Sequence, residues 1–175
     1  MRERYFRMYE SIKYKECFYD AHFDRANRRY YAFTYMMLAI SIGSVLIWNT
    51  VNKMPAIWSV VIAAAQFAQA LSSYLLCSKQ LTALKFLQPE LKKLSLAVDR
   101  DWLALDLNGY SDKKILELVA KYESAYTSLE NQFVQDTEFP ESEAILKKAE
   151  KDTRAYFYSR YPSTSSNERG ELVNV

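Results

Sequence analysis

Glycine, proline, cysteine and histidine are all scarce in this chain of 175 residues, with counts of three, four, two and one. Three glycines cannot build a glycine-rich phosphate loop, and the sequence holds neither a nucleophile elbow nor a metalloprotease motif. The one histidine, His22, has no cysteine or second histidine at ligand spacing, which excludes the usual zinc sites. We therefore expect no enzyme activity, no cofactor and no metal, and we place His22 on an exposed helix in a structural or surface role.

Charge is missing from two long runs. Between Arg29 and Lys53 there are 23 consecutive uncharged residues, and between Lys53 and Lys79 there are 25. At about 1.5 Å per helical residue these runs reach roughly 34 and 37 Å, against a bilayer core of about 30 Å. The predicted fold class is an all-α membrane protein: a two-helix transmembrane hairpin with N-terminal and C-terminal cytoplasmic helices, oligomeric. The alternative is a hairpin buried inside an α-helical protein that does not cross a membrane.

The distribution of basic residues predicts the topology of this hairpin. They cluster before the first span and after the second, whereas the turn between the spans offers only Lys53. The positive-inside bias then places both termini in the cytoplasm. Cys17 and Cys77 fall on or near that side, where thiols stay reduced, and we expect no disulfide.

The sequence pattern divides the chain into five parts. We expect an N-terminal cytoplasmic amphipathic helix at 1–29, transmembrane helices at 30–52 and 54–78, a cytoplasmic helical domain at 79–160 and a flexible tail at 161–175. The aromatic stripe of the first helix packs either on other helices of the protein or on a membrane surface. Its members recur at roughly helical spacing: Tyr5, Tyr9, Ile12, Tyr19 and Phe23.

Three helices are expected within the domain at 79–160. The first carries a heptad-like seam suited to contact within one chain or between chains, and Pro89 should kink or restart it. Ser111 is a predicted N-cap for a second helix at 112–134. A third helix follows at about 140–159. The seam of the first helix consists of Leu84, Leu87, Leu91, Leu94 and Val98.

A polar stripe runs along the second predicted span. At 100° per residue its members lie within an arc of about 80°, and an amide facing lipid without a partner is costly. The stripe predicts a hydrogen-bonded seam between helices, a water-containing pore or a ligand site, and the sequence does not rank the first two. The candidate pore-lining residues are Ser59, Gln66, Gln69 and Ser73.

Basic residues form three groups on the predicted cytoplasmic helices. They are interpreted either as membrane anchors and solvated helix faces, or as a site for a phosphate-rich ligand with tyrosines available for base stacking. The third group lies at 147–160. The candidate phosphate ligands come from the first two groups: Arg25, Arg28, Arg29, Lys92 and Lys93.

The order of these elements resembles the SLATT-domain proteins. The resemblance covers residues 5–160 and rests on architecture: a basic helix entering a span ("RANRRYYAFTYMMLAISIGSVLIWNTV"), a short turn, and a second span that continues into a long helix ("SVVIAAAQFAQALSSYLLCSKQLTALKFLQPELKKL"). It implies an oligomeric pore-forming effector of bacterial anti-phage defence in the inner membrane, whose opening depolarises the cell.

The resemblance also implies partners. We expect a homo-oligomer, with a tetramer favoured, embedded in a lipid bilayer and gated by a nucleotide or oligonucleotide that a partner nucleotidyltransferase makes. The alternative function is a non-conducting membrane scaffold or receptor that recruits a protein partner through its cytoplasmic helices. A small membrane enzyme is the third hypothesis, which the missing catalytic groups disfavour.

Overall fold

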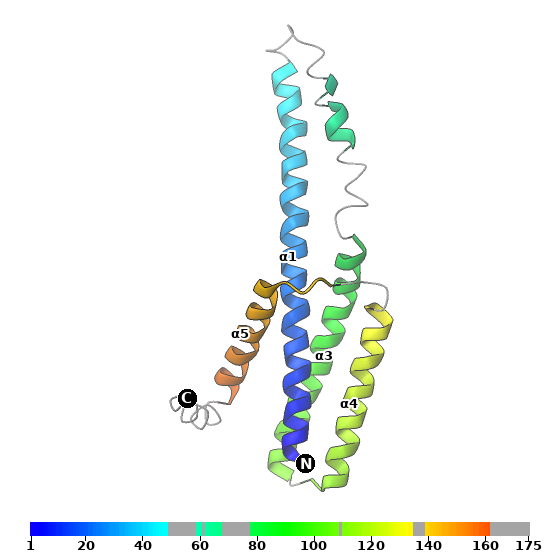
Figure 1. Ribbon diagram of the computed structural model, residues 1–175, viewed down its shortest axis with the longest axis vertical. Helices are drawn as coiled ribbons and strands as arrows, with labels where there is room; N and C mark the ends of the chain where they lie inside the picture. The colour runs from blue at the N-terminus through cyan, green and yellow to red at the C-terminus, as the bar shows by residue number, and fades with distance from the viewer. Residues whose placement is uncertain (49–58, 61, 68–77, 109, 135–138, 162–175) are drawn as a thin grey trace. The chain divides into compact units, whose positions relative to one another are not determined.

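The computed structural model describes residues 1–48, 59–60, 62–67, 78–108, 110–134 and 139–161 (Figure 1). Its helices are α1 (Arg2–Trp48), α3 (Ser78–Asn108), α4 (Asp112–Phe133) and α5 (Glu143–Arg160), with short helical stretches at 59–60 and 62–67. The chain forms two compact units. One comprises Met1–His22 with Ala83–Val175 and is called the four-helix unit below; the other comprises Phe23–Thr82.

The predicted transmembrane hairpin is wrong for the residues that the structure describes. Among them, no helix combines the length and the apolar character that crossing a bilayer requires. The prediction rested on a count of uncharged residues. The first predicted span, 30–52, opens with Tyr30, Tyr31, Thr34 and Tyr35, whose polar atoms lower its mean hydropathy, and its last residues, 49–52, lie outside the described residues. Residues 49–58, 61 and 68–77, which include most of the second predicted span, lie outside the described residues.

Two further predictions depended on the hairpin and are corrected with it. The first is the placement in the bacterial inner membrane with both termini cytoplasmic. The second is the assignment as a membrane protein and ion channel. Both required membrane-crossing helices, and the described helices do not supply them.

Within the four-helix unit, the start of α1 and the body of α3 run antiparallel (Figure 1). The guanidinium of Arg2, at the start of α1, donates to the backbone carbonyl of Leu105, near the end of α3, at 3.3 Å. Asp20, further along α1, accepts from Gln88, which lies earlier in α3, so the two helices run in opposite directions. Their facing sides bury apolar residues at three- and four-residue spacing, as ridges-into-grooves packing requires. The buried apolar residues of α3 are Leu84, Leu87, Leu91, Val98 and Leu105.

The proline inside α3 does not restart the helix. Pro89 lies within the continuous span Ser78–Asn108, and its side chain is on the exposed face of the helix. The prediction was a kink or a restart, because proline lacks the amide donor and its ring crowds the preceding turn. Burial of Leu87 and Leu91 on either side holds the two halves against the same core.

Helix α4 begins as its sequence predicts. Ser111 has extended backbone angles, and its hydroxyl accepts from the backbone N–H of Lys114 at 3.4 Å. The buried face of α4 contains Ile115, Leu118, Val119 and Tyr122. The Tyr122 hydroxyl donates to Asp101 of α3 at 2.6 Å, which joins α4 to α3.

Helix α5 packs on α1 mainly through aromatic side chains. Phe157 lies 5.4 Å from Phe6 and 5.1 Å from Tyr9 between ring centroids. Small or short residues, Ala149 and Thr153, are buried in the preceding turns, where they let the two helices approach closely. Offset and edge-on ring pairs of this kind add to the stabilisation by burial.

The core of α3 yields a direct test. Leu91→Ala removes a side chain that is 1% exposed, and we expect it to lower the free energy of unfolding by about 2–5 kcal/mol through the lost contacts and the cavity. The same substitution at Leu116, which lies on an exposed face of α4, should change it by less than about 0.5 kcal/mol. Denaturant unfolding followed by circular dichroism measures both. Equal losses would contradict the described packing.

Candidate interaction surface

A buried carboxylate joins three helices in the four-helix unit. Asp99 of α3 is only 5% exposed and accepts hydrogen bonds from the hydroxyls of Tyr9 at 2.7 Å and Tyr161 at 2.8 Å. It also accepts from the guanidinium of Arg160 at 3.0 Å, where α5 ends. Burial of an ionised carboxylate is costly unless it is paired, and here three donors from α1 and from the end of α5 converge on it.

These contacts change the ionisation of the groups involved. Burial alone would raise the pKa of Asp99, but the hydrogen bonds from Tyr9 and Tyr161 and the charge of Arg160 outweigh it, so the pKa lies below 3.8. Burial and the hydrogen bond to Asp99 raise the pKa of Tyr161 to about 12. At neutral pH the carboxylate is therefore ionised and the Tyr161 hydroxyl holds the proton that it donates.

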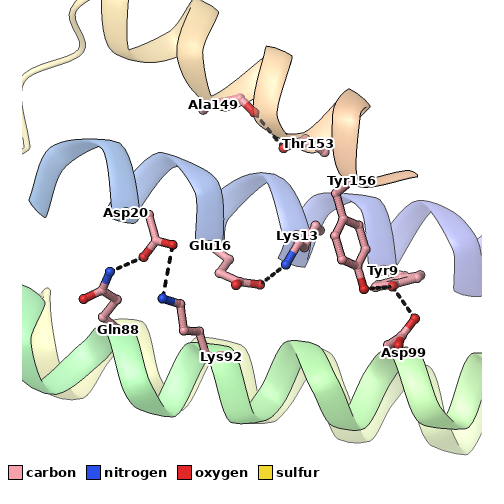
Figure 2. A network of polar contacts seen from close by, with 10 residues as sticks. All are labelled: Tyr9, Lys13, Glu16, Asp20, Gln88, Lys92, Asp99, Ala149, Thr153 and Tyr156. Atoms are coloured by element: carbon pink, nitrogen blue, oxygen red, sulfur yellow. Dashed lines mark hydrogen bonds and ion pairs between the residues drawn. The ribbon is translucent and has the colours of Figure 1, made fainter. Parts of the chain in front are cut away.

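A second polar group lies one to two turns along α1 (Figure 2). Lys13 donates to Glu16 at 2.8 Å, and both side chains are largely buried. The Lys13 ammonium also lies 4.1 Å from the centre of the Tyr156 ring, and the Tyr156 hydroxyl is 3.0 Å from that of Tyr9. This group therefore connects with the Asp99 contacts and secures α5 to α1.

A third polar contact links α1 to α3 (Figure 2). Asp20 accepts from the Gln88 amide and lies 3.5 Å from the Lys92 ammonium. The polar side chains of the four-helix unit named so far thus point at one another. Their arrangement fixes the helices against one another.

The predicted pore-lining residues fall partly outside the described residues. Ser59 and Gln66 are described, and both are exposed in short helical stretches. Gln69 and Ser73 lie outside the described residues. The structure therefore describes only part of the polar stripe, and the pore-lining role of these residues stays a prediction from the sequence.

The predicted phosphate ligands are divided between the two units. Arg25, Arg28 and Arg29 are exposed on the part of α1 that belongs to Phe23–Thr82. Lys92 and Lys93 belong to the four-helix unit, and each meets an acid: Lys92 meets Asp20, and Lys93 lies 2.6 Å from Glu90. These lysines carry helix contacts, and their binding of a phosphate stays a prediction.

His22 is not on the surface, contrary to the prediction. It is buried, and its ring lies edge-on to Phe18 at 4.6 Å and Phe139 at 5.5 Å between centroids. Cys17 is half-buried, and burial raises the pKa of its thiol, which lowers its reactivity. Across the described ranges, no group of three or more histidine, cysteine or acidic residues could hold a metal ion.

The face of α3 that points away from the core carries large apolar side chains that are exposed to solvent. Phe86 is 59% exposed, Leu96 65%, Leu103 39% and Leu107 85%. At 100° per residue these lie within about 100° of one another, on the side opposite to the buried leucines. Pro89, Lys93 and Arg100 lie between them. We call this set the outer stripe of α3; its members are Phe86, Pro89, Lys93, Leu96, Arg100, Leu103 and Leu107.

Sequence inspection did not single out the outer stripe or Asp99. The seam predicted from the sequence lies on the buried face of α3. The outer stripe repeats the same alternation of three and four residues on the exposed face. A second search of the helix for that spacing would have found it. The signal for Asp99 is an acid next to the buried seam residue Val98, a position at which an acid needs a partner.

Comparisons with protein-family models, curated proteins and solved structures find no match to this chain. The resemblance to SLATT-domain proteins therefore stays a prediction from the sequence.

Asp99 makes a pH-dependent contribution to stability that can be measured. Asp99→Asn should lower the free energy of unfolding at pH 7 by about 2–4 kcal/mol, because Arg160 and the hydroxyls of Tyr9 and Tyr161 lose a charged acceptor. The folded pKa is depressed, so this advantage of the wild type is complete above the unfolded value of 3.8 and disappears as the pH falls through the lower folded pKa.

Denaturant unfolding of both proteins between pH 2.5 and 7 measures the difference. Asp152→Asn, on the exposed face of α5, is the control and should change stability by less than about 0.5 kcal/mol. A wild-type advantage that stays constant across this range would contradict the ionised, paired state of Asp99.

Proposed function

We propose that this protein is a non-enzymatic helical scaffold that binds a protein partner through the outer stripe of α3. The observation that carries the proposal is the exposure of four large apolar side chains along one face of one helix. Single exposed apolar residues are ordinary, but several gathered on one face of a helix mark an interaction site in many proteins. Alternating steps of three and four residues are the spacing at which one helix packs on another.

The interior of the four-helix unit supports this role. Several of its buried polar side chains pair with one another, and α3 is held by α1, α4 and α5 through Asp99, Asp101 and the buried leucines. A helix that is fixed on one side loses little further conformational freedom when a partner packs on its other side. The geometry thus favours recognition of a helix over chemistry on a small molecule.

The gated-pore hypothesis is not carried forward, because it required the membrane-crossing helices that are corrected above. No contact among the described residues bears on conductance or on a nucleotide ligand. The alternative function was a membrane scaffold or receptor that recruits a protein partner through its helices. The outer stripe supports the recruitment of a partner. We carry forward this recruitment role and not the membrane placement that accompanied it.

Site-specific photo-crosslinking tests the proposal. A benzoylphenylalanine placed at position 96 in expressing cells should give a discrete crosslinked species, because this position is 65% exposed in the middle of the stripe. Leu103→Glu in the same chain should abolish it by placing a charge in the apolar contact. The probe at position 116 of α4 is the control. No discrete product at 96, or the same product from 116, would overturn the proposal.

A further inference from the structure

We infer that the outer stripe of α3 binds the same stripe of a second copy of this chain, with the two α3 helices antiparallel. The inference rests on the proposed function and names its partner. It starts from the spacing of the stripe: positions 86, 89, 93, 96, 100, 103 and 107 alternate steps of three and four over 22 residues, which is about three heptads. A two-fold axis brings such a stripe against itself.

One antiparallel register places every central position of the stripe opposite another position of the stripe. Phe86 then faces Leu103 of the second copy, and Pro89 faces Arg100 of the second copy. Lys93 faces Leu96 of the second copy, so its aliphatic stem covers the leucine while the ammonium reaches solvent. The two-fold axis repeats each contact, which gives two aromatic–aliphatic contacts and two lysine–leucine contacts.

Charge complementarity selects this arrangement. Glu90 follows Pro89 directly, so in the antiparallel register it lies beside Arg100 of the second copy, and the axis makes this pair twice. Arg100 is 80% exposed, and its ion pair within the chain, to Asp101, is long at 3.6 Å. Glu90 is 43% exposed and already holds Lys93 at 2.6 Å, which leaves carboxylate oxygen positions for a second cation.

A parallel pair is disfavoured by the same residues. It would place Lys93 opposite Lys93 and Arg100 opposite Arg100, so two like-charged layers would interrupt the apolar contact. In the antiparallel register, by contrast, Lys93 and Arg100 each face an uncharged residue of the second copy. The stripe therefore specifies a direction and a register as well as a surface.

A charge exchange in the purified full-length chain tests the pair. Glu90→Arg should weaken association by on the order of tenfold, because two symmetry-related pairs become repulsive, and Arg100→Glu should do the same. The double variant with both substitutions should return to within about threefold of the wild type. Analytical ultracentrifugation over a range of concentrations measures the dissociation constants. A double variant no stronger than the single variants would overturn the register.

Cysteine crosslinking tests the direction independently. Under oxidation, a chain in which Cys17 and Cys77 are replaced by serine and which carries Phe86→Cys and Leu103→Cys together should form a covalent dimer, since each position faces the other across the axis. These positions are 17 residues apart, about 26 Å along the helix, so no bond within one chain is possible. Leu103→Cys alone should give little dimer. Strong dimer formation by that single variant would indicate parallel helices and overturn the inference.

The outcomes separate this inference from the proposed function. If the chain is monomeric at all concentrations and the photo-probe at position 96 still crosslinks to another protein, the second copy is wrong and the scaffold role stands. If the probe gives no discrete product and substitutions in the stripe do not change the dissociation constant, the second-copy inference and the proposed scaffold role are both wrong.

Discussion

The arrangement of the four-helix unit depends on one constraint: the buried carboxylate of Asp99 must be paired with hydrogen-bond donors. Asp99 lies in the interior, where an ionised group without donors would oppose folding. Its donors come from Tyr9 near the start of α1 and from Arg160 and Tyr161 at the end of α5, so pairing requires that three distant segments meet. This requirement fixes α5 against α1 and orients α3, whose opposite face is left with its apolar residues exposed.

Part of this fold could be predicted from local sequence. Helix periodicity located the buried stripe of α1 through Tyr5, Tyr9, Ile12 and Tyr19, and cap chemistry located the start of α4 at Ser111. These features depend on residues close together in the chain. The transmembrane hairpin rested on a count of uncharged residues and is wrong for the described helices, and the predicted restart at Pro89 is wrong because α3 continues through it with Leu87 and Leu91 buried on either side.

The candidate site was much less predictable. The convergence on Asp99 joins residues 61, 62 and 90 positions away, a pairing that one sequence without its fold does not reveal. The outer stripe was visible in the spacing of Phe86, Leu96 and Leu103, but spacing alone does not say which of two stripes on one helix is buried. That choice depends on the partners of α3, which only the assembled unit supplies.

The central claim is that one face of α3 holds the unit together while the opposite face receives a partner. Hydroxyl-radical footprinting of the full-length protein at low and high concentration tests both halves of it, because the modification is read residue by residue. The account predicts that Leu87 and Leu91 stay unmodified throughout, and that Phe86 and Leu96 are modified at low concentration and protected at high concentration. Equal modification of the two faces, or protection of Phe86 and Leu96 that does not depend on concentration, would contradict it.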